Sequence, residues 1–389
     1  MKYLHKKSLP VILFISLFAI NFFSLIGADI VVLITPYLKI IGANNTYTGI
    51  FTNIPSIILV LFFIIGGRFI KAKNSKGLIG LSYIISAISL VAKFFVKDHL
   101  PMLMILRIFS SLSFGIGFTL LFNILHSFAP DNRRNGIIAI YGLSGISAFP
   151  ISSWINEYII THHPHHSHIL FLIASAALVI AYLLLLTIPD PNKDNNHDDK
   201  GLNVLSLLKR KDMLTLLLIN IVFGGVFGVI SSFLPNLATY TFKIPSYSVF
   251  FTAFALTSIV IRILIFNILD KLNRSILNIT SLSFISLSLI TIIFVKSQLH
   301  LIIAGLLYGI GHSIIFPTLS SSYVAKGNET QRGVLTSGYI VFNTFGIIFF
   351  ASILGAVGDV TNLLTVFLIT AIISIAAILC GILDYKNIN

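Results

Sequence analysis

Two charged residues interrupt long apolar segments of this sequence, a setting in which a charge usually serves a function. Asp29 lies within the apolar run 10–36, and Arg107 lies within the run 101–127. A charge at the centre of a bilayer costs about 2.5–3.5 kcal/mol on insertion scales. At a helical rise of about 1.5 Å per residue, Asp29 lies about 10 Å before Pro36 and Arg107 about 9 Å after Pro101, so their depths match.

An acid and a base at matched depth could couple the protein to protons. Arg107 would hold Asp29 ionised, and protonation of Asp29 would cancel the pair and free either partner for another contact. We therefore predict that Asp29 and Arg107 form a proton-coupling pair. The alternative is a permanent ion pair that only fastens two helices together.

A further arginine and six polar side chains also lie inside apolar runs. Arg262 precedes Asp270 by eight residues, and we expect the two to form an inner gate; the alternative is that Arg262 binds substrate. The candidates for lining a substrate cavity are Asn21, Asn123, Asn220, Asn236, His312 and Asn343. For each of them, a hydrogen bond between helices is the competing interpretation. His312 also belongs to the residue type that titrates near neutral pH.

A histidine-rich segment is the remaining feature that could bind a ligand. It contains His162, His163, His165, His166 and His168, and imidazole nitrogens bind Zn²⁺, Ni²⁺ or Cu²⁺. Pro164 and the lack of a fixed helical spacing favour a solvated loop instead. We keep these histidines as weak metal candidates and expect no metal site or cofactor.

The elements that position these residues follow from composition. Hydrophobic residues make up 56% of the chain and charged residues 10%, whereas soluble domains carry about 25% charged residues. Apolar runs long enough to cross a bilayer (about 20 residues) recur throughout. We place twelve of them at 10–36, 46–69, 77–96, 101–127, 136–160, 168–188, 213–237, 247–269, 276–295, 300–323, 334–356 and 363–383. The sequence predicts an all-α integral membrane protein with twelve transmembrane helices.

The distribution of basic residues predicts the orientation. With the N-terminus inside, nineteen of the 26 Lys and Arg lie in cytoplasmic segments. Five lie on the outer side: Lys39, Lys93, Lys97, Lys243 and Lys296. Cytoplasmic loops are enriched in Lys and Arg, so both termini are predicted to be cytoplasmic. The net charge of +13 is explained by this asymmetry and by attraction to anionic lipid, without a nucleic-acid partner.

The chain also repeats itself at half its length. Residues 114–136 resemble residues 308–333, and Asn21 and Pro36 are each matched 199 residues later, by Asn220 and Pro235. The polar segment 189–212 separates the repeats. We therefore predict a six-helix bundle over 1–188, a cytoplasmic linker over 189–212 and a second bundle over 213–389. A binding site at the interface of two such repeats is typical of transporters.

The chain resembles the major facilitator superfamily in its six plus six spans, its polar central loop and its parallel repeats. That family carries G-x-L-A-D-R-x-G-R-R after spans 2 and 8. Here the second copy is Asp270-Lys271-Leu272-Asn273-Arg274, and the first begins at Gly67 with Lys71 in place of the acid. Arg107, four residues after Leu103, matches the span-4 pattern L-x-x-x-R. The resemblance implies that spans 1 and 4, with Asp29 and Arg107, line one cavity, and that the loop residues Gly67, Lys71, Asp270, Lys271 and Arg274 form a gate with Arg262.

Within the superfamily, the chain looks most like the twelve-span drug:proton antiporters and their siderophore exporters. Ile26-Gly27-Ala28-Asp29 resembles a motif whose Asp takes part in proton coupling. The span-5 antiporter signature is met at Gly145, Pro150 and Ser153, but Phe149 and Trp154 replace glycines.

The resemblance implies a monomeric, proton-coupled transporter of the inner membrane that exports a small amphipathic compound or a metal chelator. The alternative is an importer of a siderophore or another organic solute with the same fold. A lipid-modifying enzyme is the least favoured hypothesis, because such an enzyme needs clustered acids or histidines at a membrane face, and here the acids are scattered.

Overall fold

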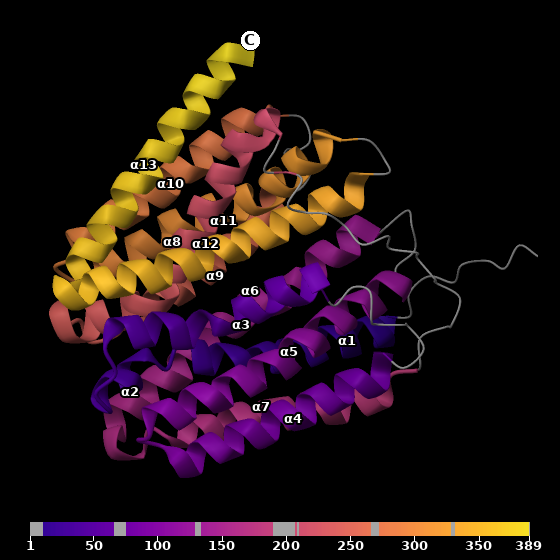
Figure 1. Cartoon of the computed structure of the whole chain (residues 1–389), viewed down its shortest axis with the longest axis vertical. Helices are drawn as coiled ribbons and strands as arrows, with labels where there is room; N and C mark the ends of the chain where they lie inside the picture. The colour runs from indigo at the N-terminus through magenta and orange to yellow at the C-terminus, as the bar shows by residue number, and fades with distance from the viewer. Residues whose placement is uncertain are drawn as a thin grey trace, which may run out of the picture.

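The protein is a bundle of long helices that run side by side (Figure 1). The computed structural model describes residues 11–65, 75–128, 134–189, 207, 210–265, 272–327 and 331–388. The long helices in this part of the chain are α1 (Val11–Val32), α3 (Asn45–Ile65), α4 (Ser75–Val96), α5 (Leu100–Phe128), α6 (Arg134–His162), α7 (Ile169–Thr187), α8 (Leu214–Asn236), α9 (Ser248–Ile265), α10 (Arg274–Ile293), α11 (Gln298–Ala325), α12 (Arg332–Val360) and α13 (Leu363–Ile388).

These twelve helices confirm the all-α membrane fold, and their ends differ from the predicted ones by at most five residues. Nine spans in the described residues are long and apolar enough to cross a membrane. Short helices continue or connect the long ones: α2 (Thr35–Ile40), η3 (Pro164–His166), η5 (Lys211–Met213) and η6 (Leu237–Thr241). We call the end where α1, α4, α6, α8, α10 and α12 begin the basic end. The opposite end, which holds α2, is the far end.

Asparagine side chains fix where several helices begin. The Asn44 side-chain oxygen accepts a hydrogen bond from the backbone N–H of Tyr47 (2.8 Å) at the start of α3. Asn273 accepts from Ser275 N (2.9 Å) in α10, and Asn362 accepts from Thr365 N (2.9 Å) in α13. The first N–H groups of a helix have no partner within the helix, and an asparagine at this position supplies one.

The matched prolines break the first helix of each repeat at the same place. α1 ends at Val32, and Pro36 lies in the first turn of α2. Pro235 lies in the last turn of α8, after which the chain continues as the π-helix η6. Proline has no N–H to donate to the preceding turn, so both helices lose their regular bonding near the far end.

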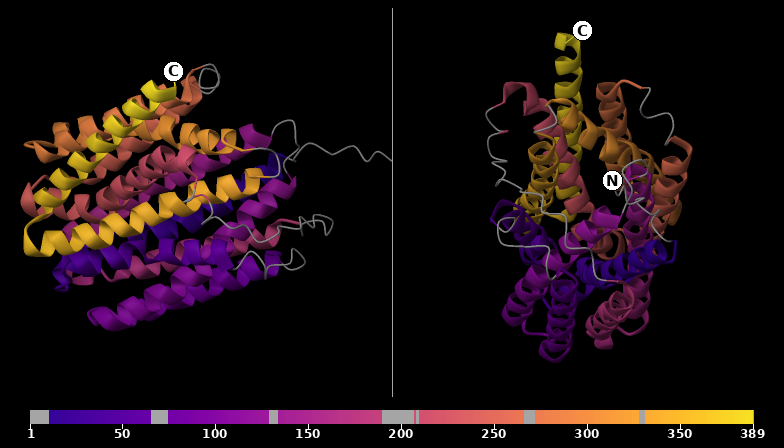
Figure 2. Two further views of the ribbon diagram at one scale, coloured as in Figure 1. Left: turned by 45° about the horizontal axis from the view of Figure 1, so that its top comes forward. Right: turned by 90° about the vertical axis from the view of Figure 1, so that its right-hand side faces the viewer.

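The hydrophobic core is divided between two groups of helices, seen as the indigo-to-magenta and the rose-to-yellow helices in Figures 1 and 2. One core cluster joins side chains of α1 to α7, among them Leu17, Phe51 and Phe171. The other joins mainly side chains of α8 to α13, such as Phe233 and Phe367, and includes Phe149 of α6 where the two groups meet. We call these sets the first and second helix groups.

Glycines allow the two helix groups to pack closely where α3 crosses α12. A Cβ at Gly49 would clash with the backbone carbonyl of Ala351, and a Cβ at Gly355 would lie 2.8 Å from the carbonyl oxygen of Asn45. Backbone atoms cannot move aside as a flexible side chain can. Both positions therefore require glycine for this approach, as is common where membrane helices pack.

We expect Gly49→Val to force α3 and α12 apart. Overpacking of this kind costs about 1–3 kcal/mol, because the added side chain meets a backbone carbonyl. The melting temperature of the purified protein should fall. Gly77→Val is the matched control, since no atom lies within 4 Å of a Cβ added to Gly77. Equal melting temperatures for the two variants would contradict the requirement for close packing.

Candidate functional site

Arg107 is buried between α5 and α3, where its guanidinium binds backbone oxygens. Its Nε donates to Phe51 O (3.1 Å) and its Nη2 to Thr52 O (3.3 Å), and the group lies over the Phe51 ring, 5.5 Å from the centroid. Pro55 lies inside α3 and lacks the N–H that would otherwise bind Phe51 O. Arg107 therefore fills a vacancy that the proline creates in the helix.

Asp29 lies on α1 and is half-buried. It is close enough to Arg107 for the two charges to interact. However, no hydrogen bond or ion pair joins its carboxylate to Arg107 or to any other described residue. The guanidinium of Arg107 binds carbonyl oxygens of α3 instead. The two residues thus share one region without forming a permanent ion pair, and their role in proton coupling stays a prediction.

Lys93 was counted on the outer side, and it does lie near the far end of its span, but its burial was not predicted. The residue lies inside α4 with 0% of its surface exposed, and its Nζ donates to Ser110 Oγ at 2.8 Å. Its charge also interacts with that of Arg107. The sequence did hold a signal: Ser82, Ser86 and Ser89 precede Lys93 at helical spacing and mark a polar helix face.

The matched asparagines make matched hydrogen bonds. Asn21 Nδ2 donates to Ser144 Oγ (2.6 Å), and Asn343 Nδ2 donates to Asn220 Oδ1 (3.3 Å); each pair spans 123 residues. Asn220 also donates to Tyr323 Oη (3.2 Å) and Tyr339 O (2.8 Å). The repeat thus extends to individual contacts, which tie the first helix of each group to α6 or α12. Asn21 Oδ1 is buried without a partner, and Asn220 and Asn343 adjoin an aromatic cluster, so the cavity role of all three stays a prediction.

That cluster surrounds His312 on α11. Five aromatic rings lie with centroids 5.0 to 6.3 Å from the imidazole. They belong to Phe223, Phe227, Phe254, Tyr308 and Phe316. Arg262 lies beside them, with its guanidinium 5.6 Å from the centroid of the Phe316 ring. His312 Nδ1, Arg262 Nε and the hydroxyls of Tyr308 and Tyr339 are buried without hydrogen-bond partners.

Asn236 and the gate residues have separate positions. Asn236 is buried at the end of α8, and both polar atoms of its side chain lack partners, so it keeps its place as a cavity candidate. Arg274 is exposed at the first turn of α10. Gly67, Lys71, Asp270, Lys271 and the side chain of Asn123 lie outside the described residues, and so does any contact of Arg262 with Asp270.

The histidine-rich segment connects α6 to α7 at the far end. His162 stacks on Tyr158 with ring centroids 4.6 Å apart, and His168 packs on Phe94 at 5.0 Å. Burial and the neighbouring Lys97 charge lower the pKa of His168. In the described part of the chain, no three His, Cys, Asp or Glu side chains gather as metal ligands would.

Two carboxylates tie the helix groups together at the far end. Asp359 at the end of α12 accepts from the backbone N–H groups of Asn45 (2.6 Å) and Thr46 (2.9 Å), which begin α3. Glu157 near the end of α6 accepts from Tyr247 N (2.6 Å), Ser246 Oγ (2.7 Å) and Ser248 Oγ at the start of α9. Each acid thus caps a helix of the opposite group, where the helix dipole favours negative charge.

Other contacts between the groups lie on the same side of the bundle. Ser232 Oγ on α8 lies 2.8 Å from both Thr52 Oγ1 and Asn53 Nδ2 on α3. Tyr240 Oη donates to Pro36 O (3.2 Å). Phe149 of α6 packs against Phe251 with ring centroids 5.2 Å apart. These contacts close the far end of the bundle.

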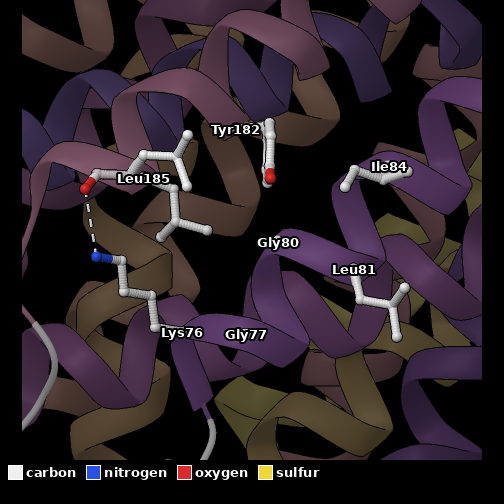
Figure 3. A pocket seen from close by; sticks show the side chains of 8 residues that line it. Lys76, Gly77, Gly80, Leu81, Ile84, Tyr182 and Leu185 are labelled. Carbon is white, nitrogen blue, oxygen red and sulfur yellow. Dashed lines mark hydrogen bonds between the residues drawn. The ribbon is translucent and has the colours of Figure 1, made fainter.

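A shallow groove at the basic end is separate from this site. Figure 3 shows its lining, which comes from α4 and α7 and includes Lys76, Gly80 and Tyr182. Lys76 Nζ donates to the carbonyls of Leu186 (3.3 Å) and Ile188 (2.5 Å). All of its lining residues belong to the first helix group, so the groove does not lie between the groups.

A twelve-helix bundle with internal repeats, closed at one end and holding isolated charges within it, is the architecture of a membrane transporter. The profile of the Major Facilitator Superfamily matches residues 17–327 and 216–386, and the chain belongs to this family. It is therefore a multi-pass membrane transporter of small molecules rather than an enzyme.

Solved structures with the same fold include several transporters. The nucleoside transporter NupG superposes with a TM-score of 0.81 at 16% identity, covering 96% of this chain and 99% of its own. A bacterial homolog of the human lysosomal transporter Spinster, inward-facing and occupied, gives 0.71 at 13% identity, covering 98% and 97%. The human organic anion transporter MFSD10 gives 0.66 at 14% identity, covering 95% and 98%. No curated protein sequence matches the chain.

We expect removal of the two capping carboxylates to open the far end. A helix cap is worth about 1 kcal/mol, so the double variant Glu157→Ala, Asp359→Ala should shift the closed-to-open ratio by a factor of about 30. With the lone Cys380 replaced by serine, spin labels at Asp98→Cys and Lys296→Cys report the separation of the groups. The distance distribution should lengthen and broaden.

The matched control for this experiment is Asp212→Ala. Asp212 forms an exposed ion pair with Arg210 (2.7 Å) at the basic end, so its loss should leave the far-end distance unchanged. A double variant whose distances match those of the control would show that the caps do not hold the groups together.

Proposed function

We propose that the protein is a proton-coupled secondary transporter of the inner membrane that works by alternating access as a monomer. Its substrate is a small amphipathic compound or a metal chelator, and the direction of transport is export. This places the chain near the drug:proton antiporters and siderophore exporters of its family. The two helix groups, with 189–212 as a cytoplasmic linker, act as the moving bodies.

The observation that carries this proposal is the environment of Asp29. Its carboxylate lies within a membrane span, beside the charge of Arg107, and has no bonded partner among the described residues. An acid held in a fixed ion pair would resist protonation, whereas an unpaired acid near a cation can exchange its proton. Arg107 keeps its place through the carbonyls of Phe51 and Thr52, so it acts on Asp29 through its field.

The orientation in the membrane is argued from the distribution of Lys and Arg, and the direction of transport is argued from which end of the bundle is closed. The basic end faces the cytoplasm, with both termini, because Lys and Arg concentrate in the segments at that end. The far end then faces outward, and the conformation described above is the one closed to the outside. In the export cycle, a proton that reaches Asp29 from outside biases the groups back toward this conformation after substrate has left.

Import remains the second candidate, and Phe149 is the observation in its favour. The antiporter signature of span 5 expects glycine at this position. Here the ring packs against Phe227 and Phe251 of the second helix group, with centroids 5.8 and 5.2 Å away. A bulky residue at that contact alters the helix interface that the signature describes, so the direction of transport needs its own test.

Comparative profiling of small molecules distinguishes these candidates. Cells and medium of a parent strain and a deletion strain are compared in metal-limited and metal-replete growth. A compound trapped inside the deletion cells supports export and identifies the substrate. A chelate left unused in the medium supports uptake.

We predict that Asp29→Asn abolishes proton-driven accumulation of that substrate while the protein remains folded and inserted. The amide cannot exchange a proton, so a pH gradient no longer biases the transport cycle. Uptake into everted vesicles with and without the gradient measures the effect. Asp98→Asn, which changes an exposed far-end acid of the same helix group, should transport normally. Uphill transport by Asp29→Asn would contradict proton coupling through this residue.

A further inference from the structure

The charges within the described spans do not balance. Lys93, Arg107 and Arg262 lie within α4, α5 and α9, three to seven residues from the nearest described helix end, and Asp29 lies three residues before the end of α1. Glu157 and Asp359 lie near helix ends, where they cap α9 and α3. An excess of positive charge inside a membrane protein is costly unless an anion shares the site.

Of these cations, Arg262 makes the fewest hydrogen bonds. Lys93 donates to Ser110, and Arg107 donates to two carbonyls. Arg262 makes no hydrogen bond to any described residue, and its Nε is buried without a partner. A guanidinium carries five N–H donors in a planar fork that matches carboxylate, sulfonate or phosphate oxygens.

Arg262 also lies at a contact between the two helix groups. It belongs to α9 of the second helix group, and a Cβ at Gly142 on α6 would lie 3.7 Å from its Nη1. The guanidinium therefore faces the first group, close to Gly142. The hydroxyl of Tyr339, also buried and without a partner, is close enough to interact with Arg262 electrostatically. Arg262 and Tyr339 together present donors to one anionic group.

The surroundings of Arg262 are aromatic. Phe316 lies under the guanidinium and is 44% exposed. Its ring is stacked with His312 at an interplanar angle of 20° and meets Tyr339 edge-on at 81°. An exposed ring beside a cation, within a cluster of further rings, suits a planar aromatic ligand better than an aliphatic one.

We propose that the transported substrate is an aromatic anion whose negative group binds Arg262 and Tyr339 and whose ring packs on Phe316 beside His312. This inference rests on the proposed transport function and assigns a substrate class to it. It also gives Arg262 the role of substrate ligand, the alternative to an inner-gate residue.

The test is binding of matched probes to the purified full-length protein in lipid nanodiscs, by calorimetry. The probes are naphthalene-2-carboxylate, its neutral carboxamide and the non-aromatic cyclohexanecarboxylate. A hydrogen bond from Arg262 to a charged carboxylate is stronger than one to a neutral amide. The carboxylate should therefore bind about tenfold more tightly than the carboxamide. Equal affinities for the two, or no binding by either carboxylate, would overturn the inference.

Three variants assign the effect to residues. Arg262→Gln should abolish the preference for the carboxylate, and Arg262→Lys should keep part of it. Phe316→Leu should weaken the binding of naphthalene-2-carboxylate about two- to tenfold and leave the binding of cyclohexanecarboxylate unchanged, because only the contact between aromatic rings is lost. Lys296→Gln, which changes an exposed cation of the same helix group, is the control and should bind like the wild type. A carboxylate preference that survives Arg262→Gln would also overturn the inference.

These measurements need no proton gradient, so they are independent of proton coupling. Asp29→Asn should retain the carboxylate preference. If Asp29→Asn still transports uphill but the preference depends on Arg262, the proposed coupling fails and the substrate class stands. If coupling depends on Asp29 but the probes bind equally, the proposed substrate class is contradicted and the proposed proton coupling stands.

Discussion

A polar group inside a bilayer has no water to bind, and the arrangement of the first helix group follows from that constraint. Pro55 deprives Phe51 O of its helical donor, and Arg107 supplies one. Lys93 finds a serine hydroxyl rather than a carboxylate. The buried cations are thus held by neutral oxygens, and Asp29 is left without a bonded partner. This is the physical condition under which an acid can gain and lose a proton.

The need of every polar group for a partner also applies at the helix ends, and there it links the far end of the bundle to its interior. The N–H groups that begin α3 and α9 need acceptors, and carboxylates of α12 and α6 supply them across the interface between the groups. α12 also carries Tyr339 and Asn343, and α6 also carries Gly142 and Ser144. Each helix that closes the far end therefore reaches the interior site as well. A rigid tilt of α6 or α12 would change both regions together, which is what alternating access requires.

Some contacts could be predicted from the sequence because they repeat. The 199-residue offset pairs Asn21 with Asn220 and Pro36 with Pro235, and the structure gives these positions equivalent bonds and helix breaks. The burial of Lys93 was not predicted because the residue lies three residues before the end of its helix, where a lysine usually reaches the membrane surface. The serines that precede it at helical spacing carried the information, but one face of a single helix does not reveal what packs against it.

The sequence alone determined the helices, their number and the family, because long apolar runs must span a bilayer and only helices satisfy their own backbone there. It also identified Asp29, Arg107, Arg262 and His312 as side chains in unusual surroundings. Only the tertiary structure decided which of them meet. The Arg107 contacts with α3, the two carboxylate caps and the aromatic rings around His312 all join residues far apart in the chain. Such contacts depend on how helices rotate and cross, and the hydrophobic pattern of a helix surrounded by lipid and protein leaves that rotation open.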